Sequence, residues 1–354
     1  MTSPVRKKPG HRRKKSADSM GEFALIDSLF APLTAGEPRA FSLQDDAAEL
    51  HESARVVSKD VLIAGVHFPV DQPLDIAARK ALRVNLSDMA AMGAKPVEYL
   101  LGCAWPVNTD LCDIKSFVDG LAMDQATYRL NLLGGDTTRH AGSAPLVISV
   151  TMLGAAPKGG VLNRSGARQG DDVFVSGTIG DARLGLSIAL GDLEVGDLEV
   201  DDLEKGRDDG AFLLDRYQLP SPRIALGGAL SGIATSAIDI SDGLIADAGH
   251  IARTSDKRLC LQAEDIPVSA PALCWIKQQR SSRTALGQLV SGGDDYELLF
   301  TASPKSRRAV EMAARLTRTS VARIGTVKAG SGVELIDEKG APMPLKATGY
   351  SHFS

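Results

Sequence analysis

Two periodicities of apolar residues divide the chain into expected strands and helices. Alternating or short continuous apolar runs bounded by Gly, Pro or Asp predict strands, and apolar residues spaced three and four apart predict amphipathic helices. Strands are expected at residues 55–65, 97–105, 145–153, 173–176, 236–240, 296–300, 322–327 and 333–337. Helices are expected at residues 21–30, 75–92, 114–130, 181–190, 244–251 and 309–316.

The length of 354 residues exceeds the usual size of one hydrophobic core, so two domains are expected. The Gly- and Pro-containing segment 154–160 is the predicted boundary, between an N-terminal domain over 21–157 and a C-terminal domain over 158–354. Residues 1–20 are basic and aperiodic, which predicts a disordered tail. Residues 191–207 form a short acidic repeat, which predicts a loop insertion without a catalytic role.

The net charge of −4 conceals an uneven distribution. Residues 1–20 hold seven basic residues and one acid, a charge of +6, which leaves −10 for residues 21–354. An acidic body argues against a nucleic-acid-binding face. No apolar run approaches the ~20 residues of a membrane helix, and no apolar segment follows the basic start, so neither a membrane span nor a secretory signal is expected.

The four cysteines are Cys103, Cys112, Cys260 and Cys274. They include no CxxC pair and fit no zinc or disulfide framework. We therefore expect buried free thiols in a reducing cytoplasm.

Acidic residues recur at the ends of expected elements, next to Gly or Ser. They are Asp45, Asp46, Asp60, Asp88, Asp136, Asp239, Asp242, Asp294 and Asp295. Oxygen ligands at such junctions suit hard cations, Mg²⁺ above all. Asp88 stands among apolar neighbours, where an unpaired carboxylate is costly, so it needs a cation or hydrogen-bond donors.

The stretch 236–250 combines these features in the order strand, acidic turn and helix, which aims carboxylates and a helix N-terminus at a ligand. The sequence contains no Walker A motif, GxGxxG loop or nucleophile elbow. A phosphate site without a P-loop must neutralise ATP largely through metal ions. The residues alone are therefore compatible with a multi-metal phosphate enzyme and leave other functions open.

Nine motifs, in order along residues 21–353, together resemble the thiamine-monophosphate kinase family. They are Glu22-Phe, Asp45-Asp-Ala, Ala64-Gly-Val-His-Phe68, Val84-Asn-Leu-Ser-Asp-Met-Ala-Ala-Met-Gly-Ala94, Gly134-Gly-Asp-Thr-Thr138, Arg164-Ser-Gly, Asp239-Ile-Ser-Asp-Gly-Leu244, Ser291-Gly-Gly-Asp-Asp-Tyr-Glu-Leu298 and Gly349-Tyr-Ser-His-Phe353. Each motif is modest alone, but the ordered set is highly specific.

The resemblance implies an α/β (α+β) architecture, namely the two-domain fold of the aminoimidazole-ribonucleotide synthetase-like superfamily, with mixed sheets flanked by helices. It also implies a homodimer built through the N-terminal domains, with the active site in a cleft near that interface. The implied reaction moves the γ-phosphoryl group of ATP onto thiamine monophosphate and gives thiamine diphosphate. The attacking phosphate oxygen is already ionised, so in-line positioning and Mg²⁺ replace a strong general base.

By motif position, the resemblance assigns three sets of residues. The implied magnesium ligands are Asp45, Ser58, Lys59 (backbone only), Asp60, Asp88, Asp136, Asp239 and Asp242. The implied ATP contacts are Gly135, Asp136, Arg164 and Ser241, and the implied substrate contacts are His67, Asp294 and Tyr350. Tyr350 would pack on a thiamine ring, and Asp294 would face the cationic part of thiamine. Asp88 and Asp239 should then lie close in space, whereas Asp247 matches no ligand position.

Three positions depart from the commoner family pattern. Gln44 stands where Gly is usual, Lys59 where Thr is usual, and Asp294 where Glu is usual. A protonated Lys cannot ligate Mg²⁺ through its side chain. We hypothesise that Lys59 contacts phosphate directly and replaces some metal charge, while its backbone carbonyl is still able to serve a metal.

Two other functions stay open. The first is a sister enzyme of the superfamily that acts on another phosphate acceptor, and the second is a non-catalytic sensor of nucleotides or thiamine phosphates. Selenophosphate synthetase needs a reactive Cys or selenocysteine near the N-terminus and the hydrogenase-maturation type a C-terminal Cys, but this sequence has no Cys before Cys103 and ends His352-Phe-Ser. The nearly complete acidic set argues against a sensor.

Overall fold

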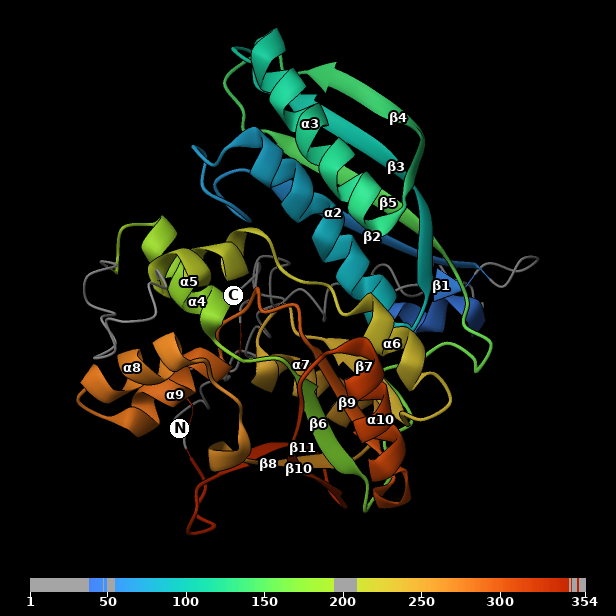
Figure 1. The fold of residues 1–354 in the computed structure, drawn as a ribbon, viewed down its shortest axis with the longest axis vertical. Helices are drawn as coiled ribbons and strands as arrows, with labels where there is room; N and C mark the ends of the chain where they lie inside the picture. Colours follow the sequence, from blue (N-terminus) through green and yellow to red (C-terminus); the bar gives the residue numbers. More distant parts are fainter. Residues whose placement is uncertain are drawn as a thin grey trace, which may run out of the picture.

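A computed structural model of the chain describes residues 38–46, 48–49, 55–193, 209–343, 345 and 349. Two sheet-containing halves lie one above the other, with the N-terminal half at the top of Figure 1. The predicted tail 1–20, the predicted helix 21–30, Tyr350 and most of the acidic repeat 191–207 lie outside the described residues.

The first half is a five-stranded sheet with two long helices on one face. Its strands are β1 (Ala48–Glu49), β2 (Arg55–Ile63), β3 (Lys95–Trp105), β4 (Asn131–Arg139) and β5 (Val147–Ala155), in the order β1-β2-β5-β3-β4. Strands β3 and β4 are parallel, and the other neighbours are antiparallel. A 3₁₀ segment, η4 (Pro38–Leu43), precedes β1, and the covering helices are α2 (Leu74–Ala91) and α3 (Leu111–Tyr128).

Local chemistry sets the ends of both helices. The carboxylate of Asp110 accepts a hydrogen bond from the backbone N–H of Asp113 at 2.9 Å, and the Asp113 carboxylate accepts one from the N–H of Asp110 at 3.0 Å. This capping box starts α3. Helix α2 follows Pro73 and stops before Gly93, whose φ of +66° is the left-handed conformation that commonly ends helices.

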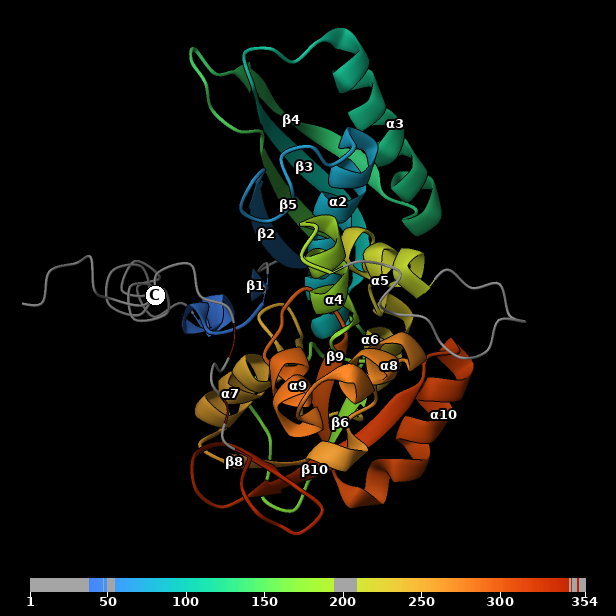
Figure 2. The same cartoon turned by 90° about the vertical axis from the view of Figure 1, so that its left-hand side faces the viewer.

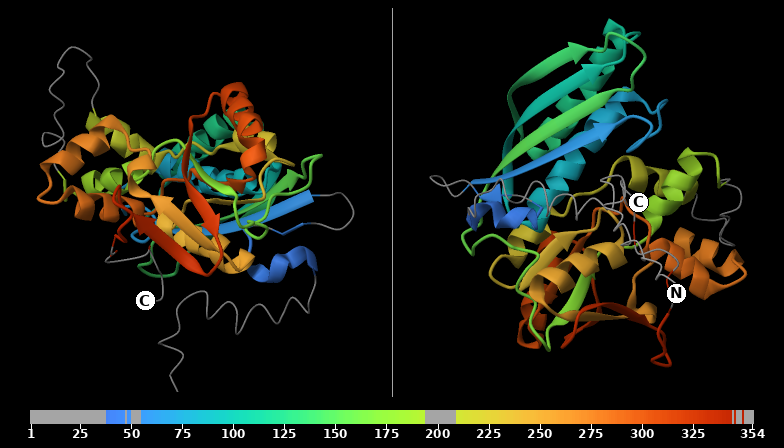
Figure 3. Two further views of the ribbon diagram at one scale, coloured as in Figure 1. Left: turned by 90° about the horizontal axis from the view of Figure 1, so that it is seen from below. Right: turned by 180° about the vertical axis from the view of Figure 1, so that it is seen from behind.

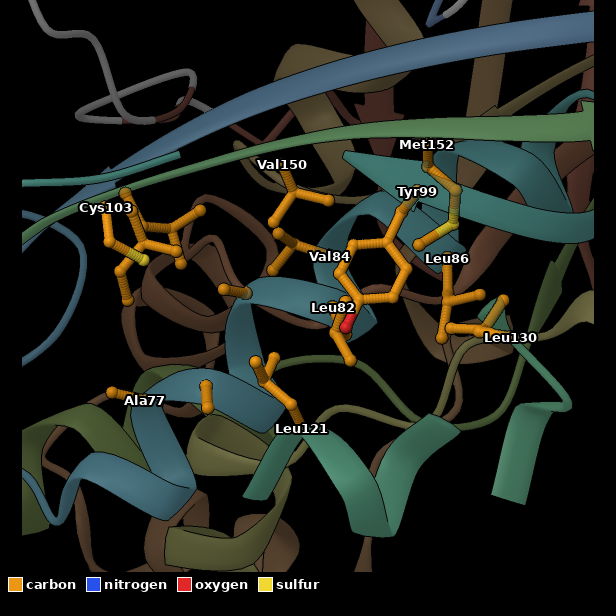
Figure 4. Close-up of a cluster of buried hydrophobic side chains, with 14 of the residues drawn as sticks. Ala77, Leu82, Val84, Leu86, Tyr99, Cys103, Leu121, Leu130, Val150 and Met152 are labelled. Atoms are coloured by element: carbon orange, nitrogen blue, oxygen red, sulfur yellow. The ribbon is translucent and has the colours of Figure 1, made fainter. Parts of the chain in front are cut away.

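The core of the first half lies between its sheet and helix α2 (Figure 4). Every second residue along β5 is buried, including Val150 and Met152. These side chains belong to one cluster with Leu82 and Leu86 of α2 and Tyr99 of β3. Apolar side chains that recur every two residues on the strand and every three to four residues on the helix therefore pack together in one layer.

The opposite face of this sheet carries neither α2 nor α3, as the right-hand view of Figure 3 shows. Val61 and Leu100 lie on this open face and are 44% and 41% exposed. The ammonium group of Lys59 lies there too, 2.6 Å from Oγ of Ser149 and 3.3 Å from Oγ1 of Thr151. Exposed apolar groups on a sheet face suit contact with another protein surface.

The second half is a six-stranded mixed sheet in the order β11-β8-β10-β6-β9-β7. Its strands are β6 (Asp172–Ser176), β7 (Ser236–Asp239), β8 (Arg258–Gln262), β9 (Leu298–Ala302), β10 (Val321–Lys328) and β11 (Gly332–Ile336). Its helices are α4 (Asp181–Ala189), α5 (Asp209–Gln218), α6 (Ile224–Leu230), α7 (Leu244–Ser255), α8 (Ala270–Gln278), α9 (Ser282–Val290) and α10 (Arg307–Thr317), with short 3₁₀ turns η7 (Ala263–Asp265) and η8 (Pro304–Ser306). Strands β8 and β11 are parallel, and the other neighbours are antiparallel.

Helix α2 belongs to both halves and runs down to their junction in Figure 2. Its last turn packs Ala90 and Ala91 against a cluster that contains Phe174 and Phe300 of the second sheet. Helix α6 crosses α2 at close range because residue 227 is Gly, where a Cβ would lie only 1.9 Å from the carbonyl oxygen of Ala90. One rigid helix therefore fixes the two sheets relative to each other.

A buried ion-pair network ties α5 and the start of α6 to the second sheet. Glu297 is fully buried and accepts hydrogen bonds from Nη2 of Arg216 at 2.7 Å, from Nε of Arg223 at 2.6 Å and from Oγ of Ser176 at 2.6 Å. A buried carboxylate is tolerated only when its charge and lone pairs are matched in this way.

Most of the predicted elements are confirmed to within a few residues at their ends, and two mixed sheets flanked by helices confirm the predicted fold class. The expected placement of acids at element ends is wrong for Asp60, Asp88 and Asp136, which lie inside β2, α2 and β4. All four cysteines are free, and the prediction of burial is confirmed for Cys103 and Cys260, but Cys112 is exposed and Cys274 is only partly buried. Among the helices that the structure describes, none is long and apolar enough to cross a membrane.

The Glu297 network generates a stability prediction. Replacing Glu297 with Ala leaves two guanidinium groups without their carboxylate, so we expect a loss of about 3–5 kcal/mol in the free energy of unfolding, measured by urea titration. Asp119→Asn is the matched control, because the Lys115–Asp119 pair is exposed and worth less than about 1 kcal/mol. Equal stability of Glu297→Ala and the control would contradict this account.

Candidate active site

Two distant loops are joined by backbone hydrogen bonds beyond the ends of β7 and β9. The N–H of Tyr296 donates to the carbonyl of Ile240 at 2.8 Å, and the N–H of Asp294 donates to the carbonyl of Ser241 at 2.8 Å. Gly293 permits this approach, since a Cβ there would lie 2.3 Å from the Ser241 carbonyl oxygen. The motifs around residues 239–244 and 291–298 thus form one side of a single site.

The adjacent acids Asp294 and Asp295 have different environments. Asp295 is fully buried and accepts hydrogen bonds from the backbone N–H groups of Gly180 at 2.9 Å and Ala182 at 3.4 Å, at the start of α4. Asp294 lines a cavity instead. Asp294 and Tyr296 have φ values of +69° and +48°, which non-Gly residues rarely adopt and which cluster at functional sites. Anchoring Asp295 is therefore what presents Asp294 to the cavity.

A carboxylate cluster forms where the two halves meet. Asp88 of α2, Asp239 at the end of β7 and Asp46 each place a carboxylate oxygen within 4.8 Å of the others. The expectation that Asp88 and Asp239 are close is confirmed. Asp60 of β2 interacts with Asp88 as well. Asp46 was absent from the predicted ligand set, because sequence alone does not show which member of an acidic pair turns inward.

Burial dominates the electrostatics of this cluster. It raises the pKa of Asp60 to about 6 and raises the pKa values of Asp88 and Asp239 well above their ordinary range, with further elevation from neighbouring carboxylates. Oδ2 of Asp46 is buried and has no hydrogen-bond partner among the described residues. Buried carboxylates with free lone pairs fit a divalent cation, which would replace the protons that otherwise neutralise them.

Arg164 connects the Asp45–Asp46 turn to the C-terminal half. Its backbone N–H donates to the Asp45 carboxylate at 2.7 Å, and its guanidinium group pairs with Asp46. The guanidinium also donates to the carbonyl of Gln44 at 3.2 Å. Burial raises the pKa of Asp45 to about 6, against the opposing effect of the Arg164 hydrogen bond.

A second group of ligand-type side chains lies at the start of α7. Asp242, Asp247 and His250 place donor atoms within 4.8 Å of one another. Asp247, which we set aside from the sequence, is buried and accepts hydrogen bonds from the backbone N–H groups of Asp242 at 3.1 Å and Gly243 at 3.2 Å. An acid in the first turn of a helix is the signal that could have identified it as the residue that holds the Asp242 turn.

The two loops and α2 enclose a cavity of about 1020 Å³. Seven predicted site residues line it: Asp60, His67, Asp88, Asp239, Ser241, Asp242 and Asp294. His67 is held in a turn, where its Nδ1 accepts a hydrogen bond from the N–H of Ile63 at 3.0 Å. Tyr296, from the motif 291–298, also lines the cavity, as do Lys80, Arg183, Tyr217 and Arg283, which no short motif indicated.

Two predicted side chains, those of Lys59 and Asp136, point to the open face of the first sheet and therefore away from this cluster in their own chain. Thr137 accepts a hydrogen bond from the indole N–H of Trp105 on the helix-covered face, so Asp136 next to it points to the open face. Gly135 lies on the exposed edge strand β4, where it pairs with Leu101 of β3, and it is not among the residues that line the cavity. The ammonium group of Lys59 donates to the hydroxyl groups of Ser149 and Thr151 on the open face, so it lies away from the carboxylate cluster of its own chain. Its hypothesised contact with phosphate stays a prediction.

Ser58 points toward α2 instead. Its side chain is buried, donates to Oδ1 of Asn85 at 3.3 Å and lies near Asp88. In the described part of the chain, Ser58 therefore lies between the sheet and α2, next to the carboxylate cluster.

Comparison with known proteins supplies relatives over nearly the whole chain. Residues 44–156 match the family model described as AIR synthase related protein, N-terminal domain. The chain is 42% identical over 334 residues to the thiamine-monophosphate kinase of Caulobacter vibrioides, covering 94% of this chain and 90% of that protein. It is 38% identical over 339 residues to the thiamine-monophosphate kinase of Escherichia coli K12, covering 94% and 98% respectively.

Solved structures give the same result. The structure described as AaThiL complexed with AMPPCP and TMP has a TM-score of 0.77 at 28% identity, over 94% of this chain and 97% of that one. The thiamine-monophosphate kinase of Stenotrophomonas maltophilia has a TM-score of 0.70 at 35% identity, over 87% and 96%. The Escherichia coli hydrogenase maturation protein HypE, at 20% identity and a TM-score of 0.64, shares the fold.

The raised pKa values generate a prediction about pH and metal. In the metal-free protein Asp45 and Asp60 titrate near pH 6 when folded and near 3.8 when unfolded, so the folded state holds more protons and its stability falls as pH rises from about 4 to 6. A divalent cation displaces those protons, so stabilisation by Mg²⁺ should be small at pH 5 and full above pH 7. We expect about 2.7 kcal/mol at a hundredfold excess over Kd, measured by thermal unfolding.

Asp239→Asn should reduce this Mg²⁺ effect at pH 7.5, while the surface variant Asp119→Asn should retain it. A Mg²⁺ effect of the same size at pH 5 and pH 7.5 would show that the buried carboxylates do not bind the cation.

Proposed function

This chain belongs to the thiamine-monophosphate kinases, and we propose that it transfers the γ-phosphoryl group of ATP to the phosphate of thiamine monophosphate, giving thiamine diphosphate. The observation that supports this most directly is the carboxylate cluster of Asp46, Asp88 and Asp239 beside a cavity of about 1020 Å³. A relative with the same fold has been crystallised with AMPPCP, an ATP analogue, and with TMP. The cavity combines metal-binding groups with room for a two-ring substrate.

We propose Mg²⁺ as the bound cation. Carboxylate oxygens without Cys or competing soft ligands favour it, and it would screen the repulsion between two anionic reactants. Asp45, Asp46, Asp60, Asp88 and Asp239 would hold it, directly or through water. The attacking phosphate oxygen needs no general base, so the work of the chain is positioning and charge neutralisation.

The elements around the cluster suit the two substrates. Ser241, Asp242 and the backbone N–H groups at the start of α7 form a helix N-terminus, which favours phosphate. Arg164, already paired with Asp46, adds a fixed positive charge beside the proposed triphosphate site. His67 and Asp294, and Tyr350 by resemblance, would contact thiamine.

The domain limits 21–157 and 158–354 remain proposals. A cytoplasmic location is also a proposal, and the four free cysteines are in keeping with it.

We propose a homodimer formed through the open face and edges of the first sheet. Exposed Val61 and Leu100 on that face and exposed Leu133 on edge strand β4 would become buried. This arrangement also gives Asp136 a role. Because Asp136 points away from Asp60 in its own chain, it would reach a metal-phosphate site only across the subunit interface, with Gly135 beside it.

The activity prediction is direct. Incubated with ATP, Mg²⁺ and thiamine monophosphate, the wild-type protein should form thiamine diphosphate, and Asp88→Asn or Asp239→Asn should lower kcat at least about a hundredfold by removing charge stabilisation from the transition state. Asp119→Asn is the control. ADP release without thiamine diphosphate would favour a sister enzyme with another acceptor, and nucleotide binding without turnover would favour a sensor.

The dimer prediction uses subunit mixing. Asp136→Asn and Asp239→Asn should each be inactive, but after unfolding and refolding together in equal amounts they should recover about a quarter of wild-type activity, because half of the dimers carry one intact site. No recovery in a confirmed mixed dimer would place Asp136 and Asp239 in the same subunit's site. A monomer by light scattering would contradict the homodimer itself.

A further inference from the structure

A buried lysine faces the cavity at the end opposite the carboxylate cluster. Lys80 of α2 is 1% exposed, yet it lines the cavity. Its Nζ lies 3.6 Å from the ring centroid of Tyr217 and 3.4 Å from Oδ1 of Asp294. Beyond that ion pair, Nζ has no well-aligned hydrogen bond with any described residue.

This environment balances the charge of Lys80 but leaves its donors free. Burial lowers the pKa of the Lys80 amine, and Asp294 opposes that effect. The face of Tyr217 adds a cation–π attraction. An ammonium group carries three N–H donors, and neither an aromatic face nor one distant carboxylate oxygen satisfies them. A buried donor without an acceptor is costly, so the site is built for an acceptor that arrives with a ligand.

The position of Lys80 along α2 defines which part of a ligand it meets. Lys80, Val84 and Asp88 are spaced by four residues and all line the cavity, so they form one stripe on the helix. Eight residues of helix separate Lys80 from Asp88 by about 12 Å along the axis. The cavity therefore has a metal-binding end at Asp88 and a second polar end at Lys80 and Asp294.

The proposed substrate is divided in the same way. Thiamine monophosphate carries its phosphate at one end, a thiazolium cation in the middle and a neutral aminopyrimidine at the other end. With the phosphate at the carboxylate cluster, the aminopyrimidine reaches the Lys80 end. The ammonium group would repel the thiazolium, but a pyrimidine ring nitrogen is an acceptor and the exocyclic amine is a donor.

We propose that Lys80 and Asp294 together recognise the aminopyrimidine edge of the substrate, with the Lys80 ammonium donating to a ring nitrogen and the Asp294 carboxylate accepting from the exocyclic amine. This inference rests on the proposed function and names a further specificity-determining residue for it. Asp294 then contacts the neutral aminopyrimidine end of thiamine rather than its thiazolium cation. Tyr217, whose hydroxyl group donates to the His67 carbonyl at 3.4 Å, holds the ammonium in place.

The test compares two ligands on two proteins. Binding of thiamine monophosphate and of its thiazole phosphate fragment, which lacks the pyrimidine, is measured by calorimetry with AMPPCP and Mg²⁺ present. Wild type should bind the whole substrate at least about tenfold more tightly than the fragment. Lys80→Met should weaken thiamine monophosphate about ten- to hundredfold, the range for a buried hydrogen bond to a charged group, and leave the fragment unchanged.

Lys115→Met, on the exposed surface of α3, is the matched control and should bind both ligands as wild type does. Equal weakening of both ligands by Lys80→Met would overturn the inference, since it would mean a phosphate contact or a general structural role. Unchanged binding of thiamine monophosphate by Lys80→Met would overturn it as well. A wild-type protein that binds neither ligand would contradict the proposed function itself.

A second comparison does not depend on the folding of Lys80→Met. Asp294→Asn, at a partly exposed loop position, should weaken thiamine monophosphate but not the fragment. For wild type, an analogue without the exocyclic amine should bind about tenfold more weakly than thiamine monophosphate. Equal binding of this analogue and thiamine monophosphate to wild type would overturn the assignment of the pyrimidine edge.

Discussion

The mutual repulsion of buried carboxylates is the constraint on which the rest of the site depends. Asp46, Asp88 and Asp239 come from three distant segments and meet within 4.8 Å, with Asp60 beside them. Such a cluster is stable only when protons or cations compensate its charge. Without those protons or cations, holding the carboxylates together lowers the stability of the fold. This arrangement is expected of a site that works by binding metal and phosphate.

Helix α2 is the element that makes this arrangement possible. Its side chains form the core of the first half, while its last turn is packed into the second half. One stripe on the same helix faces the cavity from Lys80 to Asp88. A single rigid element therefore sets both the distance between the two sheets and the distance between the two ends of the proposed substrate site.

Adjacent acids in this protein divide their tasks. The carboxylate of Asp295 accepts hydrogen bonds at the N-terminus of α4, whereas the carboxylate of Asp294 faces Lys80. In the first pair, Asp45 accepts a backbone hydrogen bond from Arg164, while Asp46 enters the carboxylate cluster. In each pair the anchored residue fixes the backbone that presents the other one, and the anchoring partner comes from more than a hundred residues away.

The sequence by itself determined the type of elements, the two mixed sheets implied by its ordered motifs, and the chemistry of the site, because periodicity and motif spacing are local properties. Asp60, Asp88, Asp239, Ser241 and Asp242 could be predicted in this way. The tertiary structure alone decided that Asp46 enters the carboxylate cluster, that Asp136 and Lys59 point to the open face, and that Lys80 is buried beside Asp294. Each of these depends on strand register or on contacts between distant segments, which no local pattern records.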